Sequence, residues 1–204
     1  MKYTLLFVLP LVFLMPIAQT VSAETNIMDK LTKAFQMLTS GDKHAMGNMT
    51  EMADSKTNPI KSLIAELKFR SGLDTYVNFE PQGYGIYQEK GSSIFKPGEE
   101  LILYIEPKGY EYGTLLDESG DKLYTIDFAV DFAISDETGN ILTSQQGITL
   151  DEIVSHHKNK ELFIPFTITQ SSPFPDGNYI ITYVIHDKNS GASFDIVKNI
   201  TIAS

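Results

Sequence analysis

The stretch from Leu123 to Ser135, LYTIDFAVDFAIS, decides the fold of this chain. Apolar residues alternate along it with polar or small ones. Because successive side chains of a β-strand point to opposite faces of the sheet, this alternation predicts a strand with one buried and one wet face. The side chains that share the apolar face are Tyr124, Ile126, Phe128, Val130, Phe132 and Ile134. We expect one long, half-buried strand.

The same period of two recurs from about Tyr76 to the end of the chain. Further strands are predicted at Tyr84–Glu89, Glu100–Glu106, Asn140–Ser144, Glu161–Thr169, Tyr179–His186 and Ser193–Ile202. Glycine turns separate them. Pro165 interrupts one run, which favours an edge strand or a bulge, and a short helix is expected at Leu150–His157. About seven strands without long helices between them predict an antiparallel β-sandwich.

Two motifs resemble immunoglobulin-like and fibronectin-like sandwich domains. Asp176-Gly177-Asn178-Tyr179, with the alternating strand that follows it, is similar to their tyrosine-corner strand. Phe95-Lys96-Pro97-Gly98-Glu99 is similar to an early hairpin in bacterial and archaeal domains of this kind. The resemblance covers residues 80 to 202 and implies an immunoglobulin-like sandwich. Ile181 stands where antibody-type domains carry cysteine, and the chain has no Trp. The resemblance therefore implies no antibody-type domain and transfers no functional residue.

A helical period precedes the strands, between about Asn26 and Leu73. Asn58-Pro59 has the features of a helix start, and Ser71-Gly72 of the end. Lys43 to Ala53 is a weaker helical candidate. The apolar stripes are Ile27, Leu31, Ala34, Phe35 and Leu38 in the first helix, and Ile60, Leu63, Ile64 and Leu67 in the last. We divide the chain into residues 1–23, a helical segment at 24–75 and a sandwich at 76–204.

Residues 1–23 have the pattern of a secretory signal peptide. Lys2 supplies a positive start, Leu5–Leu14 is apolar, and Val21-Ser22-Ala23 precedes the expected cleavage before Glu24. Retention as an anchor is the alternative, but the apolar run is shorter than the roughly 20 residues of a spanning helix and contains two prolines. A secreted, periplasmic or envelope protein without a membrane span after cleavage is expected.

Composition narrows the possible functions. With 16 basic and 26 acidic residues the net charge is −10, which disfavours nucleic acid as a partner. The absence of cysteine excludes thiol catalysis, cysteine-ligated metal sites and a lipid anchor on cysteine. No nucleophile elbow, phosphate loop or H-E-x-x-H motif occurs. We therefore do not expect an enzyme.

The sharpest chemical hypothesis is a copper site at His44, Met46, Met49 and Met52. The spacing M-x-x-M-x-x-M places three thioethers along one side of a helix, and thioether and imidazole ligands suit Cu(I) outside the cell. Small exported copper carriers with a β-sandwich are similar in outline. The alternative is that these methionines form the apolar face of an ordinary helix.

Tyrosines supply the remaining signal. Tyr84, Tyr87, Tyr110 and Tyr112 lie among glycines near the first predicted hairpins. Tyrosine among Gly and Pro is frequent at recognition surfaces, although alternate tyrosines also pack in cores. We therefore expect an exported, non-enzymatic protein without a cofactor that binds a protein or surface partner through these tyrosines. The alternative is a Cu(I) carrier.

Overall fold

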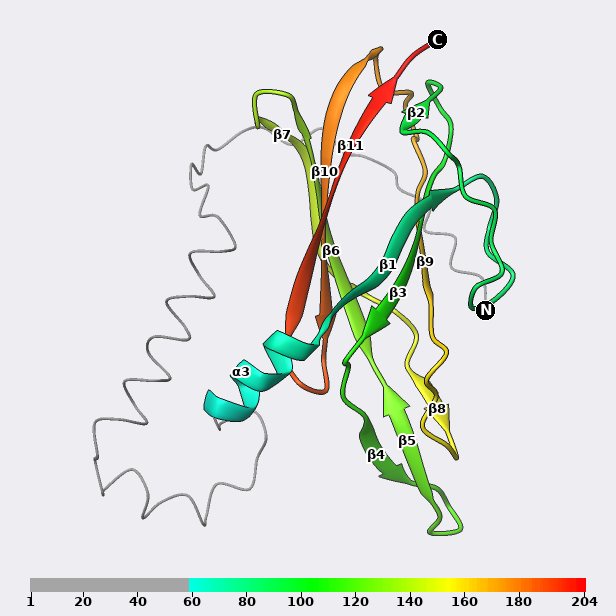
Figure 1. Cartoon of the computed structure of the whole chain (residues 1–204), viewed down its shortest axis with the longest axis vertical. Coiled ribbons are helices and arrows are strands. Elements are labelled where there is room, and N and C mark those ends of the chain that lie inside the picture. The colour runs from blue at the N-terminus through cyan, green and yellow to red at the C-terminus, as the bar shows by residue number, and fades with distance from the viewer. Residues whose placement is uncertain (1–58) are drawn as a thin grey trace, which may run out of the picture.

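The computed structural model describes residues 59–204, and Figure 1 shows how they are arranged. The described chain is mainly β-structure with one short helix, as the alternation predicts. Its elements are α3 (Pro59–Lys68), β1 (Arg70–Val77), β2 (Ile94–Phe95), β3 (Leu101–Lys108), β4 (Gly113–Leu116), β5 (Lys122–Ile126), β6 (Phe128–Asp136), β7 (Ile141–Thr149), β8 (Ile153–Ser155), β9 (Ile164–Ile168), β10 (Gly177–Asp187) and β11 (Ser193–Ile202). The predicted signal peptide and the helical stretches before residue 59 lie outside the described residues.

The strands form three sheets. One has the order β1-β3-β9, and a second has the order β2-β11-β10-β6-β7. Their strands pair antiparallel, except that β2 runs parallel to β11. A third, smaller sheet has the order β4-β5-β8 and projects from the lower end of the molecule in Figure 1.

Side chains of the two larger sheets meet in one core. The ring of Phe166 on β9 lies 5.9 Å from that of Phe132 on β6 and 5.7 Å from that of Tyr183 on β10, centroid to centroid. Every second residue of β10 is buried there: Tyr179, Ile181, Tyr183 and Ile185. Burial of a large apolar side chain contributes about 1.5–3 kcal/mol, so this core holds the two sheets together. The arrangement is compatible with a β-sandwich.

Five strand predictions are confirmed by β3, β7, β9, β10 and β11, of which β11 has the predicted bounds and the other four have shifted ones. Pro165 lies on β9, which is an edge strand of its sheet, as the missing N–H of proline predicts.

The predicted long strand Leu123–Ser135 is two strands in different sheets, β5 and β6. Asp127 lies between them. Its carbonyl accepts the backbone N–H of Lys188 at 2.9 Å, and its carboxylate lies 2.7 Å from the Lys188 ammonium. Asp127 therefore bonds to the turn after β10 at the break between the two strands. The alternation continues across the break, with Ile126 and Phe128 both buried, so the pattern does not reveal it.

Two further predictions are wrong. Leu150–His157 forms no helix, and its central residues form β8, which pairs with β5. The pairing partner lies far away in sequence, so a local pattern does not report it. Tyr84–Glu89 forms no strand, only isolated bridges from Val77 to Glu89 and from Gly83 to Ile86. Gly85 takes a positive φ of 69° there, which turns the chain out of the extended conformation.

Helix α3 begins at Pro59, as predicted, and ends at Lys68, whereas the predicted end signal Ser71-Gly72 lies within β1. It packs on the core through Ala65, followed by Phe69, whose ring lies 4.8 Å from Phe194 of β11. Ile64 and Leu67, two members of the predicted apolar stripe, are exposed. The stripe therefore does not mark the face that packs on the described sheets.

The sheet begins earlier than the sequence predicts. Residues 70–75, assigned to the helical segment, belong to β1, which pairs antiparallel with β3. Directly after β3 comes Gly109, with φ of 77°. A Cβ there would lie 2.1 Å from the carbonyl oxygen of Lys68, the last residue of α3. Only glycine allows the helix end to approach this loop so closely.

Candidate functional site

The four tyrosines of the predicted binding surface are partly buried and take part in two clusters of contacts. Tyr84 accepts a hydrogen bond from the Lys108 ammonium at 2.6 Å, and the Tyr87 ring lies 4.2 Å from that of buried Tyr104. The Tyr104 hydroxyl donates to Glu106 at 2.8 Å, and burial raises its pKa. These contacts fasten the loop after β1 to β3. Structural packing therefore accounts for Tyr84 and Tyr87.

Tyr110 and Tyr112 lie together beyond the end of β3. Both hydroxyls donate to the backbone carbonyl of Asn159, at 2.7 and 2.5 Å, and the two rings meet edge to face at 5.4 Å. Burial, and then the neighbouring Tyr112 hydroxyl, raise the pKa of Tyr110. This pair joins the β3–β4 connection to the segment before β9.

Tyr112 also leads to a group that sequence reasoning missed. Its ring lies 6.3 Å from that of Tyr124 on β5. The Lys158 ammonium lies 5.0 Å from the Tyr112 centroid and 5.4 Å from that of Tyr124, and the Lys122 ammonium lies 5.2 Å from the latter. Leu116 pairs with Lys122 and shares its side of the sheet. We call Tyr112, Leu116, Lys122, Tyr124 and Lys158 the aromatic face. The sequence carries no signal for it, because Tyr124 reads as one more inward residue of a long strand.

The sheet that carries the aromatic face also leaves aliphatic side chains in solvent. Leu116 is 69% exposed, Val154 45% and Leu115 38%. Leu115 pairs with Leu123, and Val154 pairs with Thr125. Leu115, Leu123 and Val154 therefore share one side of the sheet, and Leu116 lies on the other side with the aromatic face. Exposed apolar side chains gathered on one small element are a mark of interaction surfaces.

A buried carboxylate holds this end of the molecule together. Asp187, with no exposed surface, accepts hydrogen bonds from the Ser190 hydroxyl at 2.6 Å and from the backbone N–H of Glu111 at 2.8 Å. The Asn189 amide donates to the carbonyls of Glu111 and Thr125, each at 3.2 Å. The β10–β11 turn is thereby fastened to the start of the projecting sheet. These contacts hold the sheet that carries the exposed Leu115, Leu116 and Val154 in a fixed position relative to β10 and β11.

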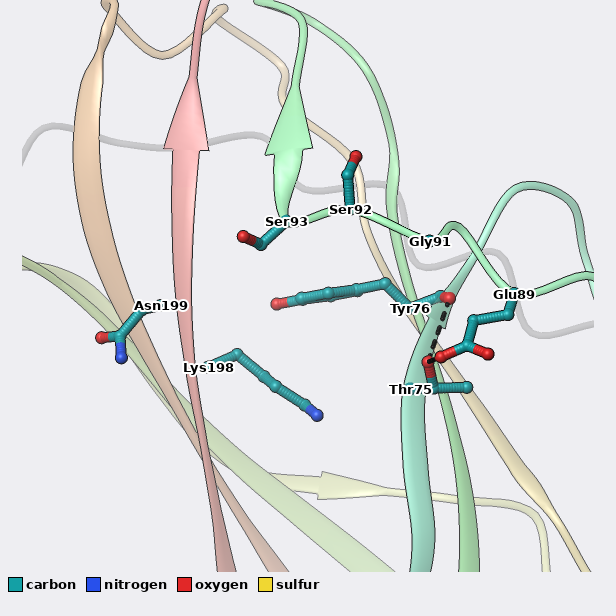
Figure 2. A pocket seen from close by; sticks show the side chains of 8 residues that line it. All are labelled: Thr75, Tyr76, Glu89, Gly91, Ser92, Ser93, Lys198 and Asn199. Carbon is teal, nitrogen blue, oxygen red and sulfur yellow. Dashed lines mark hydrogen bonds between the residues drawn. The ribbon is translucent and has the colours of Figure 1, made fainter.

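A small open cavity of about 230 Å³ is lined by residues of β1, of β11 and of the segment before β2 (Figure 2). Its lining includes the buried Tyr76 and the polar residues Glu89, Ser93, Lys198 and Asn199. Ligand pockets that bury a small molecule usually enclose about 300–1,000 Å³. The cavity is smaller than these and open to solvent, so it is a weak candidate for a ligand site.

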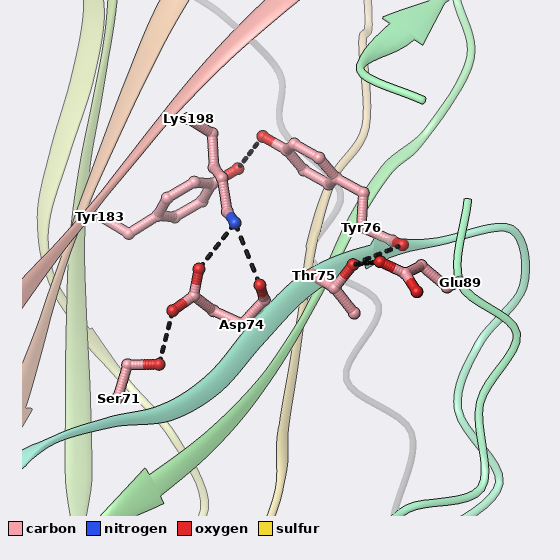
Figure 3. A network of polar contacts seen from close by, with 7 residues as sticks. All are labelled: Ser71, Asp74, Thr75, Tyr76, Glu89, Tyr183 and Lys198. Carbon is pink, nitrogen blue, oxygen red and sulfur yellow. Dashed lines mark hydrogen bonds and ion pairs between the residues drawn. The ribbon is translucent and has the colours of Figure 1, made fainter. Parts of the chain in front are cut away.

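The polar contacts beside this cavity join the two larger sheets (Figure 3). The Lys198 ammonium on β11 lies 2.6 Å from the Asp74 carboxylate on β1 and donates to the Asp74 carbonyl at 3.0 Å. The hydroxyls of Tyr76 and Tyr183 share a hydrogen bond of 3.1 Å. Burial raises the pKa of both tyrosines. Each group has a partner, and the cluster is a clasp between the sheets.

One histidine lies beside a carboxylate on the outer side of the five-stranded sheet. His186 Nε2 is 2.9 Å from Asp131, which also accepts the Gly147 N–H at 2.6 Å. Burial opposes ionisation of Asp131, but the hydrogen bonds from Gly147 and His186 outweigh it and lower its pKa. Asp131 on β6 thereby contacts both His186 on β10 and Gly147 in the bulge of β7, a structural role.

A metal site needs several ligand side chains close together. No group of three or more His, Asp or Glu within residues 59–204 is arranged to hold a metal. Asp117 in the β4–β5 turn and Asp136 in the β6–β7 turn each accept backbone N–H groups of their own turn. The copper hypothesis at His44, Met46, Met49 and Met52 lies outside the described residues and stays a prediction.

A comparison of the sequence with protein-family models finds no match, and a comparison with curated proteins finds none either. No helix in the described part of the chain is long and apolar enough to cross a membrane.

Proposed function

We propose that this chain is an exported, non-enzymatic binding protein whose scaffold is an immunoglobulin-like sandwich. The strand order supports the scaffold: β1-β3-β9 corresponds to strands A-B-E, and β11-β10-β6-β7 to G-F-C-C′. The Tyr179 hydroxyl at the start of β10 donates to the carbonyl of Pro175 at 2.9 Å, the contact of a tyrosine corner. Export is inferred from residues 1–23, which have the signal-peptide pattern.

The projecting sheet β4-β5-β8 carries the proposed binding surface. In immunoglobulin-like domains the loops at one end of the sandwich bind ligands, and this sheet is built from the connections between β3 and β6 and between β7 and β9. Its aromatic face combines tyrosines with exposed Leu116. Tyrosine is enriched at binding hot spots, and exposed apolar side chains that gather in one place mark interaction surfaces. The observation that carries the proposal is the aromatic face with its exposed Leu116, on a sheet whose start is held in place by the contacts of Asp187.

In this proposal the predicted tyrosines divide in role. Tyr110 and Tyr112 hold the surface in place through Asn159, and the ring of Tyr112 is also part of it. Tyr84 and Tyr87 hold the loop after β1 and lie outside the proposed surface.

The test compares the full-length chain with two single variants, each immobilised and exposed to envelope and extracellular proteins of the source organism. Leu116→Ser removes an exposed side chain of the surface, and Ile141→Ser removes one of similar exposure, 64%, on β7. We expect a partner retained by the wild type and by Ile141→Ser, with an affinity about tenfold or more lower for Leu116→Ser. Equal binding by all three proteins contradicts the proposed surface.

A Cu(I) carrier is the second candidate function, favoured by the methionine spacing at Met46, Met49 and Met52. The test is titration of the full-length chain with Cu(I) under reducing conditions against a competing chelator. The triple variant with leucine at these three positions keeps the apolar character and removes the sulfur atoms. One-to-one binding that the variant loses supports the carrier, and binding that it retains contradicts it.

A further inference from the structure

The two sides of the projecting sheet differ in chemistry. One side is the aromatic face, where Lys122 and Lys158 lie over the tyrosine rings. The other side carries Leu115, Leu123 and Val154, which we call the aliphatic face. Both leave apolar side chains in solvent, whereas a sheet at the surface of a monomer normally keeps one side polar.

The charges of the two regions are complementary. Lys122 and Lys158 form no ion pair with any described residue and lie near one ring, so their ammonium groups are at most 10.6 Å apart. The turn that joins β4 to β5, at the tip of the same sheet, carries the exposed acids Glu118 and Asp121. Neither acid is in an ion pair within residues 59–204. Among residues 59–204, this sheet therefore presents cations without an ion-pair partner on one side and anions without one at its tip.

We infer that the partner of this surface is a second copy of the chain, bound head to tail. The acidic tip and aliphatic face of one copy lie on the aromatic face of the next. In this contact Glu118 and Asp121 of one copy pair with Lys122 and Lys158 of the next. The aliphatic face of the first copy and Leu116 of the second are buried between them. The inference rests on the proposed function, because it names the partner of the same sheet.

The charges also select the geometry of assembly. A two-fold axis through the aromatic face brings lysines against lysines beside the axis, and a two-fold axis through the tip brings acids against acids. Head-to-tail contact avoids both and leaves one face free at each end, so the assembly grows as a chain or closes as a ring. The net charge of −10 opposes association at long range, but at physiological salt the screening length is about 8 Å, and the local contact dominates.

Charge reversal on each side, followed by mixing, tests the inference. The first variant of the full-length chain carries Lys122→Glu and Lys158→Glu, and the second carries Glu118→Lys and Asp121→Lys. We expect the wild type to form assemblies whose mass, measured by light scattering and analytical ultracentrifugation, rises with concentration and falls with salt. Each variant alone should associate at least about tenfold more weakly, because both its contact regions then have the same sign. An equimolar mixture should recover the wild-type assembly, because opposite charges meet again.

Recovery on mixing cannot come from misfolded variants, and unchanged thermal unfolding of each variant serves as the control. A wild type that stays monomeric at all concentrations overturns the inference, as does a mixture that stays as small as its components. Self-association that both variants retain assigns it to another surface and also overturns it. The proposed function has a separate readout: a different protein that is lost only with Leu116→Ser supports the surface while contradicting the second copy as its partner.

Discussion

At the two ends of the described molecule, turns that both begin with an aspartate are stabilised by different contacts. At one end, which we call the corner end, β6 and β7 are joined by Asp136–Asn140, and Tyr179 contacts Pro175 four residues away. At the other, the clamp end, the turn after β10 begins with Asp187, which contacts Glu111, 76 residues away in sequence. Both turns begin with an aspartate that accepts hydrogen bonds of its own turn.

The two aspartates differ in their burial and in how far away in sequence their hydrogen-bond partners lie. Asp136 is satisfied by Thr138 and Asn140 alone, so the contacts of this carboxylate stay within its own turn. The distant contact of the turn is made by exposed Glu137, which accepts a hydrogen bond from Asn178. Asp187 is fully buried and binds a loop from elsewhere in the chain, so the clamp end depends on tertiary structure. The projecting sheet stands on the clamp end. A locally satisfied turn closes a hairpin, whereas the turn with the buried Asp187 also holds the start of the projecting sheet in place.

The largest effect that separates the two ends is expected from Asp187→Ala. The substitution leaves the buried Ser190 hydroxyl and the Glu111 N–H without their acceptor, and we expect a loss of about 3 kcal/mol in the free energy of unfolding. Urea denaturation followed by circular dichroism measures it. Asp136→Ala at the exposed turn is the matched control and should cost clearly less. Equal losses for the two variants contradict the distinction between the ends.

Tyr179→Phe tests the corner end. The variant keeps the buried ring and removes the hydroxyl that donates to Pro175, so the free energy of unfolding should fall by about 1 kcal/mol. The same denaturation assay measures this, and Tyr112→Phe, which removes a hydroxyl contact with Asn159, is its counterpart at the clamp end. An unchanged midpoint for Tyr179→Phe shows that the corner contact does not stabilise the fold.

Acid should weaken the corner end through Asp136. Hydrogen bonds from the side chains of Thr138 and Asn140, and then from the Asn140 backbone, lower the pKa of Asp136 from 3.8 to about 2. The folded-state pKa is therefore below the unfolded one, so this stabilisation is fully present above about pH 4 and is lost as the pH falls towards 2. Melting temperatures measured between pH 2 and 5 should fall less steeply for Asp136→Asn than for the wild type. Parallel curves contradict a contribution from this carboxylate.

The smallest effect on stability is expected from Leu116→Ser on the projecting sheet. Because the side chain is mostly in solvent, the free energy of unfolding should change by no more than about 0.5 kcal/mol. Ile141→Ser on β7 provides the comparison with a similarly exposed residue. A loss above about 1 kcal/mol for Leu116→Ser assigns this residue to the folded core and removes it from the proposed surface.

Sequence patterns predict a strand well where it pairs with the same neighbouring strands along its length. From Tyr179 on, β10 alternates between buried and intermediate residues as predicted, because β6 and β11 pair with it along nearly its whole length. The stretch Leu123–Ser135 fails, because alternation reports the side on which a residue lies and not the sheet to which it belongs. Contacts of Asp127 with Lys188, distant in sequence, decide where one strand ends and the next begins.

The predicted site shows the same limit. The glycine-rich tyrosine segments pointed to Tyr110 and Tyr112, whose rings do meet, because they are only two residues apart in the chain. Tyr84 and Tyr87 lie near β3 instead, because the chain turns at Gly85. The lysines over Tyr124 come from β5 and from the segment after β8, and no spacing in the sequence brings them together.

By itself the sequence determines the β-rich class, the helix at Pro59–Lys68 and most of the strands, because these depend on the local period of apolar side chains and on proline and glycine. It also determines the acidic charge and the absence of cysteine chemistry. Tertiary structure alone decides that one alternating stretch is split between two sheets, that Asp187 is buried, and that lysines and tyrosines from separate segments form one face. These features depend on residues far apart in the chain, and a periodic pattern contains no information about such pairs.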